Sequence, residues 1–286
     1  MAKTHQIKSV INSTEKTAVI TQAMQLVSAS RLPTARNALN AAQPFSDTIE
    51  DIIFNYAFDE CSTHPFFNAP EKYTQVGVIT ITSDRGLCGG LNLALYKEFL
   101  KQVQLWDKDK ITPILSVAGK KGQSFFSDHA HVISTACAFG DKPNLEDLMA
   151  LITPMIHAYK TKQVGKVFIL SNQYVNTLTQ KPIMTQVLPI EPKGKVKSTG
   201  AYSFEPSHDE VLDPLLTRYI EAKIYRTVVE NIACEHAARM VAMQNATDSA
   251  QSIISELNLT YNKARQAIIT QEIAEIAAGA YSGEET

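Results

Sequence analysis

The chain has 286 residues, of which 44% are hydrophobic and 20% are charged, and its formal net charge is −2. This balance gives no reason to expect nucleic acid as a partner, and no run approaches the ~18 consecutive apolar residues of a membrane span. The opening segment, MAKTHQIKSV, lacks the apolar core of a secretory signal, so we expect a soluble cytosolic protein. Its four cysteines form no CxxC pair, which predicts a reduced compartment and no structural zinc.

The N-terminal segment from Ala2 to Leu32 contains neither glycine nor proline and is predicted to be helical. A thin apolar stripe is expected to pair it with another helix, and consists of Val10, Thr17, Ile20, Met24 and Val27. Inside a helix Pro33 would lose one backbone hydrogen bond and clash with the preceding turn, at a cost of roughly 3 kcal/mol. We therefore expect a kink or a break near 29–33, and a second helical stretch from about Pro44 to Phe58. The N-terminal helical segment as a whole spans 1–58.

Residues 72–192 have a different sequence pattern, in which short β-branched or apolar runs alternate with helical stretches. Strands are expected at 76–82, 111–117, 166–171 and 183–190. Helices are expected near 92–104 and 145–162. This alternation predicts a small α/β domain with a largely parallel sheet.

The segment TSDRGLCGGLN, residues 82–92, lies between the first strand and the first helix of this domain, where a phosphate-binding loop would lie in a nucleotide-binding fold. Gly86, Gly89 and Gly90 do not have the GxGxxG spacing, and no GK[ST] follows. A structural turn that needs positive φ is the favoured interpretation, and Cys88 is expected to be a small buried side chain. Two histidines farther along, His129 and His131, lack a third ligand at readable spacing, so no metal site is predicted.

The C-terminal part contains no glycine or proline from residue 215 to 278, which would make a single helix about 95 Å long at 1.5 Å per residue. We expect this helical segment to span 207–280, beginning near Ser207 and ending near Gly279. Apolar steps of four and three alternate along it, as in a coiled coil, at residues 229, 233, 236, 240, 243, 247, 250, 254, 257, 261, 264 and 268. Beside this seam, Glu235 and Arg239 are expected to form a solvated helix-face pair.

Several blocks, in the same order along nearly the whole chain, resemble the gamma chain of F-type ATP synthases. They are IT at 20–21, AM at 23–24, SAS at 28–30, TSDRGLCGGLN at 82–92, FEP at 204–206, VEN at 229–231, AARMVAM at 237–243, ATD at 246–248, LTYNKARQA at 259–267 and ITQE at 269–272. The resemblance implies an α/β fold with a long antiparallel coiled coil of N- and C-terminal helices and a small Rossmann-like head domain. The 82–92 segment would be the signature turn of that head, with Asp84, Arg85, Gly86, Gly89 and Gly90.

The same resemblance implies a function without bond chemistry of its own. Such a chain is the central rotor shaft that couples ion-driven rotation of the c-subunit ring to ATP synthesis and hydrolysis in the beta subunits. The expected partners are the alpha and beta subunits, the epsilon subunit and the c ring, with no cofactor, no metal and no nucleic acid. The chain would lie peripherally at the cytoplasmic side of the cell inner membrane, attached only through a proton-translocating complex.

The resemblance also assigns contact residues between rotor and stator. Arg265, Gln266 and Thr270 match upper positions that touch a beta-subunit loop, and Arg239 matches a position farther down. Met24 matches a position that faces the charged lever of the beta subunit, although simple seam packing would explain this residue as well.

The chain departs from the family pattern in its N-terminal helix. Gln22 stands where a basic residue is usual, and Arg31–Thr34 replaces a strongly basic stretch without proline. These differences leave a divergent second-copy gamma chain with altered coupling as an alternative. A dinucleotide-dependent enzyme built on the α/β domain and a free coiled-coil adaptor are weaker alternatives.

Overall fold

The computed structural model describes residues 2–60, 64–68, 70, 72–137, 139–141, 143–191 and 208–283. The chain divides into two compact units, the first formed by Met1–Val27 with Met240–Thr286 and the second by Ser28–Arg239. Two long helices, α1 (Ala2–Glu60) and α5 (His208–Gly283), pass through both units. Their ends lie within three residues of the predicted limits 58, 207 and 280. The FEP block at 204–206 lies outside the described residues.

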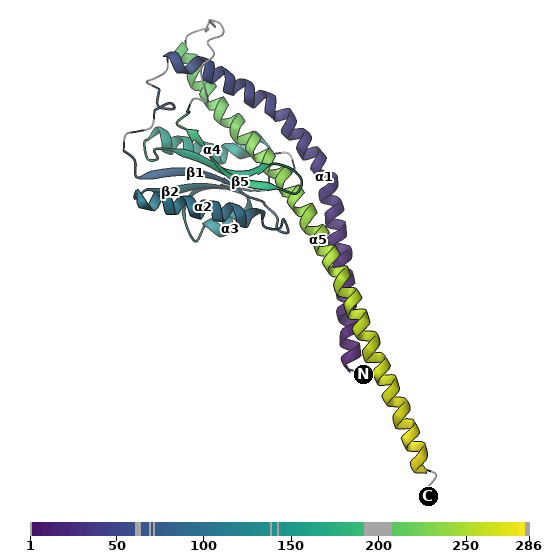
Figure 1. Ribbon diagram of the computed structural model, residues 1–286. Helices are drawn as coiled ribbons and strands as arrows, with labels where there is room; N and C mark the ends of the chain where they lie inside the picture. Colours follow the sequence, from purple (N-terminus) through teal and green to yellow (C-terminus); the bar gives the residue numbers. More distant parts are fainter. Residues whose placement is uncertain are drawn as a thin grey trace. The chain divides into compact units, whose positions relative to one another are not determined.

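The first unit is a two-helix coiled coil formed by residues 2–27 of α1 and 240–283 of α5 (Figure 1). The predicted seam of α5 is confirmed in this unit, because its positions from 240 to 268 are all buried or half-buried. The seam positions 229, 233 and 236 belong to the second unit, where every neighbouring position of α5 is buried or half-buried as well. Between 248 and 268 the remaining positions are exposed, which isolates the seam residues 250, 254, 257, 261, 264 and 268. The hydroxyl groups of Thr21 and Thr247 lie 2.7 Å apart and join the two helices within this unit.

The apolar stripe predicted for α1 is wrong, apart from the half-buried Met24. Val10, Ile20 and Val27 are 50%, 59% and 51% exposed, and Thr17 is exposed too. The buried and half-buried positions instead alternate in steps of three and four at Ile7, Ile11, Thr14, Ala18, Thr21, Gln25 and Ser28. Small and polar residues occupy several of these positions, so their hydrophobicity did not reveal the seam.

A kink or a break was predicted near Pro33; the break is wrong, because α1 is one helix with Pro33 and Pro44 inside it, and the kink stays a prediction. The separate helical stretch expected from Pro44 is the continuation of α1. Leu32 and Ala35, on either side of Pro33, are 7% and 3% exposed and belong to the hydrophobic core. Tertiary packing of this face therefore outweighs the missing hydrogen bond, as is common for helices that bury an apolar stripe.

The second unit contains a five-stranded sheet with the order β3-β2-β1-β4-β5. Its strands are β1 (Gln75–Ile81), β2 (Thr112–Ala118), β3 (His131–Ala136), β4 (Val167–Tyr174) and β5 (Gln180–Leu188). The first four are parallel neighbours, and β5 pairs antiparallel with β4. The predicted largely parallel sheet is confirmed, and β3 is an edge strand that was not predicted.

Helices cover both faces of this sheet (Figure 1). One core joins Ile79 and Ile81 of β1 to α4 (Leu145–Lys160) and to the parts of α1 and α5 that belong to this unit. The other core joins Val78 to α2 (Leu91–Lys108) and α3 (Lys120–Phe126). Adjacent residues of β1 thus face opposite layers, which explains why this strand is an almost continuous apolar run.

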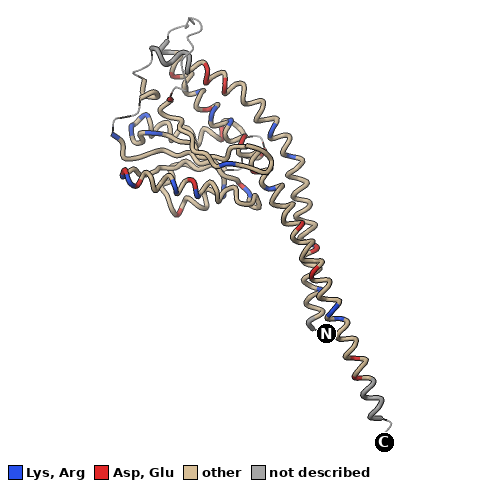
Figure 2. The backbone as a smooth tube through the Cα atoms, in the orientation of Figure 1, with Lys and Arg blue, Asp and Glu red and all other residues tan. Residues whose placement is uncertain are grey.

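Charged residues are sparse along the helices of the first unit (Figure 2). Its α1 part carries Lys3, Lys8, Glu15 and Lys16. Within the described residues no helix combines the length and the apolarity that crossing a lipid bilayer requires.

Candidate functional site

The 82–92 turn joins the carboxyl end of β1 to α2 and is closed by its own polar side chains. The backbone N–H of Ser83 donates to Asn92 Oδ1 at 3.2 Å, and Asn92 Nδ2 donates to Ser83 Oγ at 2.6 Å. Ser83 Oγ in turn donates to the carbonyl of Arg85 at 2.8 Å. These bonds fix the path of the turn without any ligand.

Positive φ in this turn falls on Leu87 (63°) and Gly89 (59°). The prediction of a turn with positive φ is thus confirmed, and among its glycines Gly89 carries it. Leu87 adopts the left-handed region although it is not glycine, and its side chain is 59% exposed. Gly90 has φ −87° and begins α2 as its N-cap residue.

Asp84 fastens the outer side of the turn to the start of α3, because its Oδ1 accepts the backbone N–H of Lys120 at 3.1 Å. Thr82 makes the neighbouring link, donating to the carbonyl of Ala118 at 2.7 Å and accepting the N–H of Gly122 at 2.9 Å. Gly119 lies beside it with φ 94°, and a Cβ there would collide with the carbonyl of Thr82. The turn is therefore held against β2 and α3 in two ways. Side chains hydrogen-bond to both elements, and the backbone at Gly119 lies close to the backbone of Thr82.

Arg239 of α5 binds the turn from its inner side. Its Nε donates to the carbonyl of Gly86 at 3.3 Å, and its Nη2 donates to the carbonyl of Arg85 at 3.4 Å. The same Nη2 lies 2.5 Å from Glu235 Oε1. Two sets of residues that the sequence analysis singled out separately, Arg239 and the turn, are thus in direct contact.

The expected solvated pair of Glu235 and Arg239 is wrong. Their side chains are 15% and 8% exposed, because this face of α5 lies against the 82–92 turn instead of water. A stator contact for Arg239 stays a prediction, and its guanidinium already has three partners within the chain.

Asp141 links both long helices to the loop between β3 and α4. Its Oδ2 accepts Arg31 Nη1 of α1 at 2.9 Å, and its Oδ1 lies 3.0 Å from His236 Nε2 of α5. The His236 side chain is 8% exposed, and its Nδ1 is buried without a partner in the described part of the chain. The sequence predicted only a seam position for His236, since no spacing rule connects residues 95 positions apart.

Two further contacts of α5 with β4 were missed for the same reason. Asn172 Nδ2 donates to Asn231 Oδ1 at 3.0 Å, and the backbone N–H of Tyr174 donates to Glu230 Oε1 at 3.0 Å. Burial raises the pKa of the Glu230 carboxyl, while the Tyr174 hydrogen bond and Arg226 act in the opposite direction. Consecutive turns of α5 therefore carry polar groups that bond to the α/β domain.

Cys88 is 3% exposed and packs against Leu91 and Cys234, which confirms its prediction as a small buried side chain. Burial raises the pKa of both thiols, so they are poor nucleophiles near neutral pH. His129 contacts the ring of Phe125, and His131 opens β3. No group of three or more His, Cys, Asp or Glu side chains suited to a metal occurs within the described residues.

The remaining predicted contact residues lie in the first unit. Arg265, Gln266 and Thr270 are exposed on α5, outside the seam, and Met24 is half-buried on α1. The hydroxyl of Thr270 donates to the carbonyl of Gln266 at 2.9 Å, as threonine commonly does within a helix. Their contact with a partner stays a prediction.

Fold and contacts together define a coiled-coil protein with a Rossmann-like α/β domain, in which α5 belongs to both units and bonds to the 82–92 turn, β4 and the β3–α4 loop. Residues 3–282 match the family model described as ATP synthase. The chain is 41% identical over 285 residues to the ATP synthase gamma chain of Coxiella burnetii, and 40% identical over 286 residues to that of Legionella pneumophila. Each match covers 98% of this chain and 99% of the relative. The chain belongs to the ATP synthase gamma-chain family.

Solved structures show the same fold at lower identity. A chain of the Euglena gracilis mitochondrial ATP synthase, in an OSCP/F1/c-ring structure, is 19% identical, with a TM-score of 0.66 and coverage of 98% of this chain and 94% of that chain. A chain of the Tetrahymena thermophila mitochondrial ATP synthase central stalk and c ring is 20% identical, with a TM-score of 0.58 and coverage of 79% and 99%. At these identities the likeness supports the fold, which agrees with the predicted coiled coil and α/β head.

Proposed function

We propose that this chain is the rotating central stalk subunit of an F-type ATP synthase and performs no bond chemistry itself. In this role it couples ion-driven rotation of a c-subunit ring to ATP synthesis and hydrolysis in the beta subunits. Its partners are a ring of alpha and beta subunits, an epsilon subunit and the c ring. Family membership and the two-helix coiled coil of the first unit support this function together.

The coiled coil is the observation that carries the proposal. Its seam on α5 continues from Met240 to Ile268 with steps of three and four. Several seam positions are alanine or threonine, which let helices approach closely and keep the pair slender. A slender and stiff element can turn inside a ring, and each orientation then stabilises a different set of catalytic-site states. Such differential contact is the thermodynamic basis of the coupling.

Further details of the proposal follow from the family. The complex is proton-translocating, and the chain is peripheral at the cytoplasmic side of the cell inner membrane, where it is held only by its partners. Arg265, Gln266 and Thr270 contact a beta-subunit loop, and Met24 lies near the charged lever of that subunit. These assignments fit side chains that are exposed or half-buried in the first unit.

Affinity purification of the tagged chain from its native membranes tests the assembly. Stoichiometric recovery of alpha, beta and epsilon subunits is the expected result. Recovery of the chain alone, under conditions that keep the synthase intact, would overturn the proposal.

Cysteine cross-linking within the purified complex tests the contact residues. Gln266→Cys places a thiol on the exposed face of α5, and Ala264→Cys places one in the half-buried seam as a matched control. We expect the Gln266 variant to form a disulfide, under mild oxidation, with a cysteine introduced into that loop of the beta subunit, and the Ala264 variant to form far less. Equal cross-linking of both variants would refute the assigned orientation.

A divergent second-copy gamma chain is the second candidate, favoured by the few basic residues of α1 (Figure 2). If altered electrostatics change the coupling, Gln22→Lys with Pro33→Arg should change proton-coupled ATP synthesis after reconstitution. Unchanged synthesis would remove this candidate. No feature of the described residues favours a dinucleotide-dependent enzyme.

A further inference from the structure

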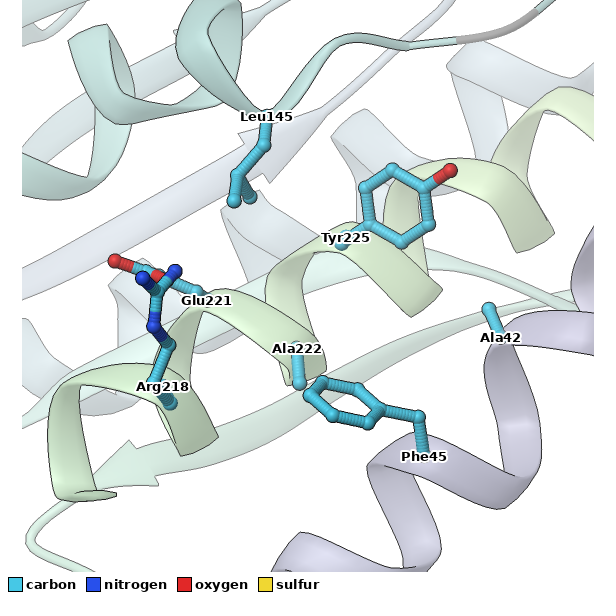
Figure 3. A pocket seen from close by; sticks show the side chains of 7 residues that line it. All are labelled: Ala42, Phe45, Leu145, Arg218, Glu221, Ala222 and Tyr225. Atoms are coloured by element: carbon cyan, nitrogen blue, oxygen red, sulfur yellow. The ribbon is translucent and has the colours of Figure 1, made fainter.

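A cavity of about 350 Å³ lies in the second unit, between α1, α4 and α5. Its walls are mostly apolar and are formed by Ala42, Phe45, Leu145, Arg218, Glu221, Ala222 and Tyr225 (Figure 3). Ala42 and Ala222 contribute only methyl groups from facing helices, which leaves the space open. Cavities of about 300 Å³ and above that are lined by apolar side chains and a few polar groups are typical of small-molecule sites.

Phe45 is an unusual wall residue, because it is a large aromatic side chain that remains 60% exposed. In Figure 3 the ring of Phe45 lies beside Ala222, and the ring of Tyr225 is separated from it. A planar apolar group in the cavity would cover the Phe45 ring and gain aromatic contact with it.

The polar part of the wall is the ion pair of Arg218 and Glu221. Arg218 Nη1 donates to Glu221 Oε2 at 2.7 Å, and their side chains are 64% and 9% exposed. Within the described residues this hydrogen bond of Glu221 uses Oε2, and its second oxygen, Oε1, is not among the buried polar atoms that lack a partner, so Oε1 keeps contact with solvent. An ionised carboxylate accepts about four hydrogen bonds, so Oε1 can accept an N–H of a ligand in place of water. Arg218 keeps further N–H donors for an acceptor at the mouth of the cavity.

We propose that this cavity binds a neutral aromatic amide. The aromatic ring fills the apolar space beside Phe45, the amide N–H donates to Glu221 Oε1, and the amide oxygen accepts from Arg218. A neutral head group is favoured because the two wall charges cancel. An ammonium group would face Arg218, and a carboxylate would face Glu221.

Three probes with the same phenylpropyl body test this chemistry, namely 3-phenylpropanamide, 3-phenylpropylamine and 3-phenylpropanoate. Each is titrated into the full chain with ¹³C-labelled alanine and leucine methyl groups. We expect the methyl signals of Ala42, Ala222 and Leu145 to shift, and the amide to bind roughly tenfold more tightly than either charged probe, the effect of one hydrogen bond to a charged group. Three equal affinities, or no shift of these methyl signals at millimolar probe, would overturn the proposal.

Two wall variants change the expected order of the probes. Arg218→Leu leaves Glu221 as the only wall charge and should make the amine the tightest probe. Glu221→Leu leaves Arg218 and should make the carboxylate the tightest. An unchanged order in both folded variants would refute the role of the pair.

Filling the cavity is the matched control for its apolar part. Ala222→Leu should abolish binding of all three probes, and Ala42→Leu serves the same purpose if the first variant does not fold. Undiminished binding to a folded, filled variant would place the probes elsewhere and overturn the proposal.

Discussion

Substitution of Arg239 by methionine removes the guanidinium group but keeps most of the aliphatic stem. Three contacts within the second unit are lost, namely those to the carbonyls of Arg85 and Gly86 and to the carboxylate of Glu235. Glu235 then keeps a charge at a side chain that is only 15% exposed. The substitution therefore creates a largely buried carboxylate without a counter-ion.

The expected loss of stability can be worked out from these contacts. Removing one partner of a buried ion pair costs about 3–5 kcal/mol. Glu235 retains some access to water, which places the loss near the lower end, and the carbonyl bonds of 3.3 and 3.4 Å are long and add little. We expect Arg239→Met to destabilise the second unit by about 3 kcal/mol, or to lower its Tm by roughly 6–12 °C.

Trp106 provides the assay, because it is the one tryptophan of the chain and lies in the second unit, 5.8 Å from the ring of Phe168. Urea unfolding of the full chain, followed by Trp106 fluorescence, gives the loss for Arg239→Met alone and combined with Glu235→Gln. The double variant should lose about 1–2 kcal/mol less than Arg239→Met, since no buried charge remains. A loss below about 0.5 kcal/mol for Arg239→Met would refute the reasoning, because such small effects are typical of surface sites.

Three further outcomes are expected. Thr247→Val should cost about 1 kcal/mol by thermal unfolding, and Thr21→Val in addition should restore part of it, since both hydroxyl groups of the 2.7 Å contact are then gone. Pro33→Ala should stabilise α1 by up to about 3 kcal/mol, because residue 33 regains an N–H for the carbonyl of Ala29, and an unchanged urea midpoint would contradict this. Burial raises the pKa of the Glu230 carboxyl above its ordinary value of 4.5. The protonated carboxyl therefore stabilises the folded state below pH 4.5, and this contribution is lost as the pH rises through the folded-state pKa. Glu230→Gln should therefore raise Tm at neutral pH, and this gain should vanish in acid; a gain that is independent of pH would contradict the linkage.

The α5 seam could be predicted from the sequence because one face of the helix carries apolar residues at regular steps of three and four. Between 248 and 268 the seam positions are alanine, isoleucine, leucine and tyrosine, and most of the residues between them are polar. On α1 the same rule failed, since the seam positions Thr14, Ala18 and Thr21 are less hydrophobic than the exposed Val19 and Ile20. Periodicity identifies a buried face only when that face is also the most apolar one.

The parts of the α/β domain that were missed have weak local signals. Strand β3 lies at the edge of the sheet and is mostly half-buried, so His131–Ala136 forms no long apolar run. Helix α3 has seven residues and contains Gly122, whose missing Cβ lets the helix approach Thr82 and Val117. Likewise, the spacing of Glu235 and Arg239 is compatible with an exposed or a buried pair, and only the position of the 82–92 turn decides between them.

Both helices of the first unit carry apolar side chains that are exposed outside the seam. A two-helix coiled coil buries one seam on each helix, yet Val19, Ile20 and Leu26 of α1 are 66%, 59% and 60% exposed. On α5, Leu259, Ile273 and Ile276 are 63%, 62% and 73% exposed. Single exposed apolar residues are ordinary, but repeated ones on both helices exceed what the seam can bury. The proposed function accounts for this surplus, because a ring of partner subunits around the coiled coil would cover faces that a free two-helix protein leaves in water.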